Sequence, residues 1–235
     1  MEAVTRRHLA NVVLCGAAIP LVLWLDRESS LEGQLVLGAF TGACLWWMLQ
    51  ALPGDDVARV WGVVLAGVVI ESFCTQVWGA YAYRLANVPM YVFFGHGMLC
   101  AAAKSGARLY RAERSRRVMV IGVAVVASLW AVLGLVLPER ADVEGALFLP
   151  LFLPLLWKSE RRLEHAHTFI AAAFVEFIGT RVHTWEWAAT LPVLGFSAGN
   201  PPSVVAGGYC YFAVLGGLVV EVLRARLAAP AQLSP

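Results

Sequence analysis

The sequence predicts an all-α polytopic membrane protein, a bundle of about eight transmembrane helices, and two observations carry this prediction. The first is composition: of the 235 residues, 60% are hydrophobic and only 14% are charged. Soluble domains contain about 45–50% apolar and about 25% charged residues, and a soluble chain of this length must still cover its surface with polar groups. These proportions exclude a soluble enzyme, a disordered protein and a secreted disulfide scaffold.

The second observation is a series of apolar runs along the chain. A helix that crosses the hydrocarbon core needs about 20 mostly apolar residues. Eight segments approach this length, namely 9–25, 35–52, 60–82, 88–103, 118–138, 146–157, 167–187 and 204–223. The sixth is short and contains Pro150 and Pro154, so we expect it to be kinked or partly re-entrant. The whole chain, 1–235, is expected to form one membrane domain.

The distribution of positive charge orients these spans. Cytoplasmic loops are rich in lysine and arginine, and with a cytoplasmic N-terminus all but four of the 18 lysines and arginines lie on the inner side. The exceptions are Arg27, Arg84, Arg140 and Arg181. The sequence therefore predicts that both termini are cytoplasmic, and we expect the protein in the inner membrane of a bacterium. The net charge of only +2 argues against a nucleic-acid partner.

Two segments of the chain resemble each other and predict an internal repeat. One begins at Glu71 and the other at Glu176. In each, a threonine follows the glutamate by four positions, and two aromatic residues separated by one position close the segment; these are Thr75, Tyr81 and Tyr83, and Thr180, Trp185 and Trp187. We expect two parallel four-helix halves, about 1–117 and 118–235, related by an axis along the membrane normal.

Glu71 and Glu176 are the main catalytic candidates. Both lie near the middle of their predicted spans, where an ionisable side chain costs about 2.5–3.5 kcal/mol on insertion scales. Because an apolar cavity favours the neutral form of a carboxyl, one of the pair could act as an acid and the other as a base. The alternative is that each glutamate only bonds a neighbouring helix. His96, also near mid-depth, could orient Glu71 or relay protons to it, or could simply be a satisfied interhelical histidine.

Other side chains are candidates for binding a substrate. Thr75 and Thr180 belong to the repeated pattern. The aromatic residues either anchor the outer interface or line a pocket above the carboxyls, where their π faces stabilise a cation; they are Trp78, Tyr81, Tyr83, Trp185 and Trp187. We expect His183 two turns beyond Glu176 on the same helix face, and Asn200 in a loop over the outer mouth. No cluster of ligands has metal-binding spacing and no nucleotide fingerprint is present, so neither a metal nor a cofactor is expected.

The segment that begins at Glu71 resembles the signature of integral-membrane carotenoid-biosynthesis proteins. These include carotenoid hydratases and small lycopene cyclases, and fungal membrane-bound terpene cyclases are a more distant comparison. The family pattern has a glutamate, a glycine three residues later, and then Gly-x-Tyr-x-Tyr. The first segment matches at Gly79, Tyr81 and Tyr83 but has Cys74 in place of the earlier glycine, whereas the second keeps Gly179 but has Thr184 and tryptophans later.

The resemblance implies acid–base chemistry on an isoprenoid dissolved in the bilayer. A carboxyl would protonate a carbon–carbon double bond, and cyclisation, hydration or isomerisation of the carbocation would follow without a nucleotide or metal. The expected partners are therefore membrane lipid and a hydrophobic isoprenoid substrate, and the sequence leaves the oligomeric state open.

Two other classes of function stay open at this point. The same carboxylates could carry protons in a transporter of small solutes or lipids, or the chain could be a structural subunit. An aromatic pocket open to lipid favours the enzyme, whereas a polar route to both membrane faces favours transport.

Overall fold

The structure, a computed structural model, describes residues 2–137 and 141–228. Within these residues the chain forms eight α-helices, which confirms the predicted all-α fold: α1 (Glu2–Asp26), α2 (Leu31–Leu49), α3 (Gly54–Ser72), α4 (Met90–Leu109), α5 (Glu113–Val136), α6 (Val143–Lys158), α7 (Arg162–Arg181) and α8 (Tyr209–Ala228). A π-helical turn, η1 (Phe73–Trp78), continues α3, and a 3-10 turn, η2 (Val205–Gly207), precedes α8. Two short strands, β1 (Tyr81–Tyr83) and β2 (Trp185–Trp187), pair in an antiparallel sheet.

Four elements in this part of the chain are long and apolar enough to cross a membrane. They are Glu2–Asp26, Gly54–Trp78, Glu113–Val136 and Val205–Leu227, and they are compatible with a membrane protein. Helices α4 and α7 are not among these four, and they carry buried polar side chains such as Lys104, His165 and Glu176. Helices that pack inside a bundle carry such groups because neighbouring helices shield them from lipid and supply partners.

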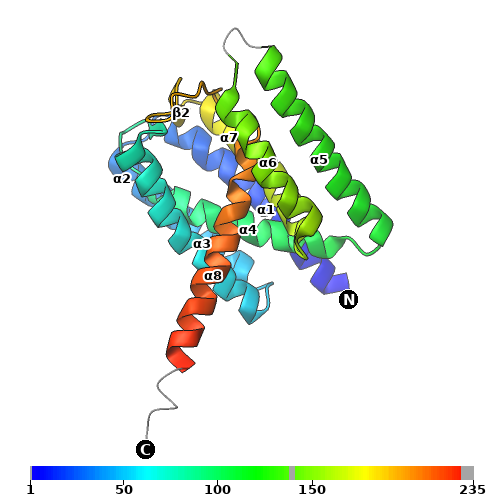
Figure 1. Cartoon of the computed structure of the whole chain (residues 1–235). Helices are drawn as coiled ribbons and strands as arrows, with labels where there is room; N and C mark the ends of the chain where they lie inside the picture. Colours follow the sequence, from blue (N-terminus) through cyan, green and yellow to red (C-terminus); the bar gives the residue numbers. More distant parts are fainter. Residues whose placement is uncertain (1, 138–140, 229–235) are drawn as a thin grey trace, which may run out of the picture.

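Helix α4 is the centre of the bundle and packs against α1, α2, α3 and α7 (Figure 1). Every residue from His96 to Gly106 on this helix is buried. Small residues make this packing close: a Cβ atom on Gly97 would lie 2.8 Å from the side chains of Leu45 and Val64. This position fixes His96 in the interior, where it faces α3 and α8. Helix α5 lies at one edge of the bundle and packs against α6 and α7 (Figure 1).

Two clusters of buried polar side chains hold the helices together. Asp26, which has no exposed surface, accepts hydrogen bonds from Gln34 Nε2 (2.9 Å) and Tyr91 Oη (2.9 Å). Arg84, the residue after β1, donates to the backbone oxygen of Asp26 (2.6 Å), which anchors the strand to α1. In the second cluster, Lys104 pairs with Asp56 (2.9 Å) and Glu164 (3.0 Å) and so joins α4 to α3 and α7.

The crossing of α3 and α8 depends on two glycines in contact, Gly62 and Gly216. A Cβ atom on Gly62 would overlap the carbonyl oxygen of Gly216, and helices in membranes use small residues to approach this closely. We expect Gly62→Ala to lower the free energy of unfolding by about 1–3 kcal/mol, the usual cost of overpacking. Thermal unfolding in detergent measures the effect. The matched control is Gly16→Ala, because nothing lies within 4 Å of a Cβ atom at Gly16; equal melting of the two variants would contradict the prediction.

Candidate active site

Glu71 lies at the end of α3, where three side chains hold its carboxylate. Its Oε1 is 2.7 Å from His96 Nε2, and its Oε2 accepts hydrogen bonds from Tyr81 Oη (2.6 Å) and Tyr83 Oη (2.8 Å). The glutamate is only 3% exposed, so all of these contacts lie in the interior. The structure therefore joins His96 to Glu71 across two helices, a contact that fits both sequence hypotheses for this histidine.

The local backbone explains how two tyrosines reach one carboxylate. The chain leaves α3 through the π-helical turn and ends it at Gly79, whose φ of 74° lies in the left-handed region that glycine adopts without strain. It then reverses, so that β1 runs back toward Glu71 and does not extend outward. Because successive side chains of a strand point to opposite faces, Tyr81 and Tyr83 are buried together while Ala82 is exposed.

Glu176, on α7, has a corresponding set of three donors. Its Oε2 accepts from Trp185 Nε1 (3.0 Å) and Trp187 Nε1 (3.1 Å), and its Oε1 accepts from the Tyr209 hydroxyl. The side chain is 2% exposed. The chain again reverses after the helix, so that the aromatic pair of β2 faces the glutamate that precedes it.

Gly179 makes this second arrangement possible. A Cβ atom at this position would overlap the six-membered ring of Trp185, so the indole lies directly against the α7 backbone. This contact sets the position from which Trp185 Nε1 reaches Glu176.

The β1–β2 sheet joins the two glutamate units. Tyr81 pairs with Trp187 and Tyr83 with Trp185 in the antiparallel register. The rings of Tyr81 and Trp187 have centroids 4.5 Å apart, and those of Tyr83 and Trp185 lie edge to face at 6.0 Å. Each pair thus contains one donor to Glu71 and one donor to Glu176, so the two carboxylates share a single aromatic layer.

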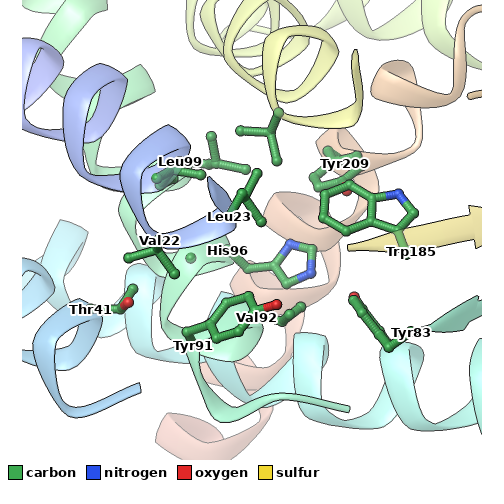
Figure 2. Close-up of a pocket in the computed structure, with 13 residues that line it drawn as sticks. Val22, Leu23, Thr41, Tyr83, Tyr91, Val92, His96, Leu99, Trp185 and Tyr209 are labelled. Carbon is green, nitrogen blue, oxygen red and sulfur yellow. The ribbon is translucent and has the colours of Figure 1, made fainter. Parts of the chain in front are cut away.

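Two cavities adjoin this layer, one lined by Tyr81 and Trp187 and the other by Tyr83 and Trp185. The larger is a groove of about 280 Å³, lined by Ile70, Glu71, Cys74, Trp78, Tyr81, Phe148, Glu176, Trp187, Val205, Gly208, Tyr209, Tyr211 and Phe212. The smaller, of about 40 Å³, has room for one or more water molecules and contains His96, Tyr83 and Trp185. Figure 2 shows these side chains facing the same space. Tyr209 lines both cavities, and Glu71 and Glu176 both face the groove.

The remaining predicted residues divide into those that line the groove and those that do not. Trp78 lines it and donates from Nε1 to the backbone oxygen of Pro192 (3.0 Å). Thr75 and Thr180 donate to the backbone oxygens of their own glutamates, at 2.7 and 2.8 Å, and so reinforce the helix ends without facing a ligand. His183 is exposed, beyond the end of α7, at a φ of 59°. It therefore does not continue the face of Glu176 as expected.

Asn200 supports the site from outside. It is exposed, and its Oδ1 accepts a hydrogen bond from the backbone N–H of Trp187 (3.2 Å), which steadies the end of β2. Tyr209 and Phe212 were not predicted, although both begin an apolar helix after a proline-rich turn and recur at helical spacing. Phe212 stacks on His96 with centroids 4.4 Å apart, and Tyr209 lies 5.2 Å from the same ring.

The site is made of carboxylates, hydroxyls, indoles and one imidazole. Among the described residues, no three histidine, cysteine or carboxylate side chains are grouped so that they could hold a metal ion. What the arrangement can do is transfer protons: two carboxylates with different neighbours face one groove, and Glu71 has a basic partner whereas the three donors to Glu176 are neutral groups. No protein-family model, curated protein or solved structure matches the chain.

Proposed function

We propose that this protein is a membrane-embedded enzyme that acts on a lipid-dissolved isoprenoid, of the carotenoid or terpenoid type, by carboxylic-acid protonation of a double bond. The observation that carries the proposal is that Glu71 and Glu176 face one groove whose other walls are largely aromatic and aliphatic. A carbocation formed there would lie against aromatic rings, whose π faces attract positive charge. The similarity of the Glu71 segment to carotenoid hydratases and small lycopene cyclases points to the same chemistry.

The hydrogen bonds distinguish the roles of the two carboxyls. An indole N–H can only donate, so both bonds from Trp185 and Trp187 require Oε2 of Glu176 to remain an acceptor. A proton on Glu176 therefore resides on Oε1, next to the Tyr209 hydroxyl, and this is the acid that would protonate the substrate. Glu71, paired with His96, is the base. Two carboxyls in different environments divide acid and base roles in this way in other enzymes.

In the proposed reaction, the proton of Glu176 forms a C–H bond with one carbon of the double bond and leaves the neighbouring carbon positive. Glu71 then takes a proton either from a carbon next to the cation, which completes cyclisation or isomerisation, or from a water that adds to the cation, which completes hydration. In each case one proton leaves Glu176 and one reaches Glu71. The aromatic and aliphatic lining of the groove would limit access of water, which would otherwise capture the cation at random.

The size of the groove indicates which part of a substrate it holds. At about 280 Å³ it is near the lower limit of small-molecule pockets, which run from about 300 to 1,000 Å³. It therefore suits the end of a long isoprenoid chain while the rest stays in the bilayer.

For the membrane arrangement we propose eight spans in two parallel four-helix halves, with both termini cytoplasmic. The matching environments of Glu71 and Glu176 support the repeat: each has a threonine bonded to its backbone and two strand aromatics that donate to its carboxylate. The concentration of basic residues in the segments predicted to lie on the inner side supports the orientation. The inner membrane of a bacterium is the proposed location.

The test is to express the chain in cells that make polyene and polyprenyl precursors and to analyse the extracted lipids by mass spectrometry. We expect a new product in cells with the native chain and none with Glu71→Gln or Glu176→Gln. Conversion of an unlabelled substrate by isolated membranes in D₂O should add one carbon-bound deuterium per reaction, because the acidic proton exchanges with solvent. A product that both variants still make would refute the mechanism. If no isoprenoid is converted, the result would favour the alternative function, a proton-coupled transporter of small solutes or lipids.

A further inference from the structure

A second groove, of about 560 Å³, lies between α5 and α7, away from the carboxyl site. It is lined by Tyr110, Arg114, Ser115, Val118, Met119, Gly122, Val123, Val126, Phe169 and Ile170. None of these residues lines either cavity beside the aromatic layer. The groove is therefore separate from the carboxyl site.

Most of this groove is an apolar channel along α5. The lining residues of α5 beyond Ser115 recur at helical spacing, and from Val118 to Val126 they extend about 12 Å at the standard helical rise. Val118, Val126 and Ile170 are exposed, so the long side of the channel opens where lipid surrounds the helices. Such a channel fits a hydrocarbon chain that enters from the bilayer.

One end of the groove is polar and positively charged. Arg114 and Ser115 lie in the first turns of α5, and Tyr110 precedes this helix. Within residues 2–137 and 141–228 Arg114 forms no ion pair, whereas Arg117 and Arg162 both pair with Glu113. No acidic side chain lines the groove. A guanidinium with nearby hydroxyl donors is well suited to a phosphate group.

We propose that this groove binds one anionic glycerophospholipid, with its phosphate at Tyr110, Arg114 and Ser115 and one acyl chain along Val118–Val126. The cationic end lies on the cytoplasmic side in the proposed orientation, and anionic lipids are concentrated in the cytoplasmic leaflet. Because an acyl chain is already in an apolar medium before it binds, selectivity arises mainly from the headgroup. The proposal is independent of the carboxyl chemistry.

The test is native mass spectrometry of the full chain titrated with phosphatidylglycerol or with phosphatidylcholine of the same acyl chains. Arg114→Gln removes the cation. Gly122→Leu adds a large side chain at a position that lines the channel, where nothing lies within 4 Å of a Cβ atom. The matched controls are Arg111→Gln, three residues before Arg114 and outside the groove, and Gly54→Leu, at another open position at the start of α3. Thermal unfolding checks that each variant is folded.

We expect phosphatidylglycerol to bind more tightly than phosphatidylcholine. Arg114→Gln should lower the affinity for phosphatidylglycerol about fivefold, which is the factor for one basic residue at an anionic surface. Gly122→Leu should weaken both lipids, and the two controls should bind as the native chain does. Equal losses in Arg114→Gln and Arg111→Gln would indicate diffuse surface charge and overturn the proposal. Unchanged lipid binding to Gly122→Leu would also overturn the proposal. So would a dimer of this chain that only Gly122→Leu disrupts.

Discussion

We expect the Glu176→Leu variant to have a much lower melting temperature than the Glu176→Gln variant, although both substitutions remove the carboxyl. Leucine leaves the indole N–H groups of Trp185 and Trp187 and the hydroxyl of Tyr209 without their acceptor. An unsatisfied buried polar group costs about 1–3 kcal/mol, and two indoles cannot change role because they only donate. We therefore expect the two indoles alone to lower the free energy of unfolding by about 2–6 kcal/mol.

Glutamine should avoid this penalty. With its amide oxygen toward the two indoles, both N–H groups keep their acceptor, and its NH₂ group can donate to the oxygen of Tyr209. The variant cannot supply the acidic proton, and general acid catalysis contributes about 10²–10⁴ in rate. Thermal unfolding of both variants, together with the lipid analysis, separates the two roles. If the two variants have the same low melting temperature, the carboxylate is required for folding. A loss of product in Glu176→Gln would then reflect unfolding and would contradict the assigned catalytic role.

Gly179→Ala is the second change with a large expected effect. The new methyl group must displace the Trp185 ring, which breaks its bond to Glu176 and disturbs its contact with Tyr83. Overpacking and one lost buried hydrogen bond together should cost about 2–5 kcal/mol. Product formation should fall with stability, because the acid loses one of its positioning groups. Gly16→Ala, at an open position, is the control for stability.

A double variant identifies the clash as the cause. Trp185→Phe has a smaller ring and no N–H, so Gly179→Ala should cost little more once this substitution is present. Residues in contact depart from additivity by about 0.5–3 kcal/mol. Additive losses in Gly179→Ala/Trp185→Phe would contradict the assigned contact.

The fold class could be predicted because composition and apolar runs depend on the whole chain. The carboxylates could be singled out for a related reason: Glu71 and Glu176 interrupt apolar runs, and a charge at such a position is costly. The structure buries both and brings His96 to Glu71. The sequence offered Glu71 as one possible partner of His96, but it could not decide this, since the partner is fixed by the packing of α4 against α3.

The strands could not be predicted from the same patterns. Short aromatic runs such as Tyr81–Tyr83 look like the interface belts that end many membrane helices, and the predicted spans 60–82 and 167–187 continued through them. The structure ends those helices at Trp78 and Arg181, because left-handed residues, Gly79 and His183, turn the chain back. Each reversal depends on the backbone conformation of one residue just after the helix, and the periodicity of apolar residues does not report that conformation. Tyr209 was missed because its role depends on α8 meeting α7, a contact between distant parts of the chain.

The pairing of β1 with β2 has a consequence for how the protein is made. The two strands belong to parts of the chain that leave the ribosome far apart in time, and each exposes unpaired backbone groups until the other arrives. The groove that both glutamates face can therefore form only after α7, β2 and the start of α8 have been synthesised, because these elements supply Glu176, Trp187 and Tyr209.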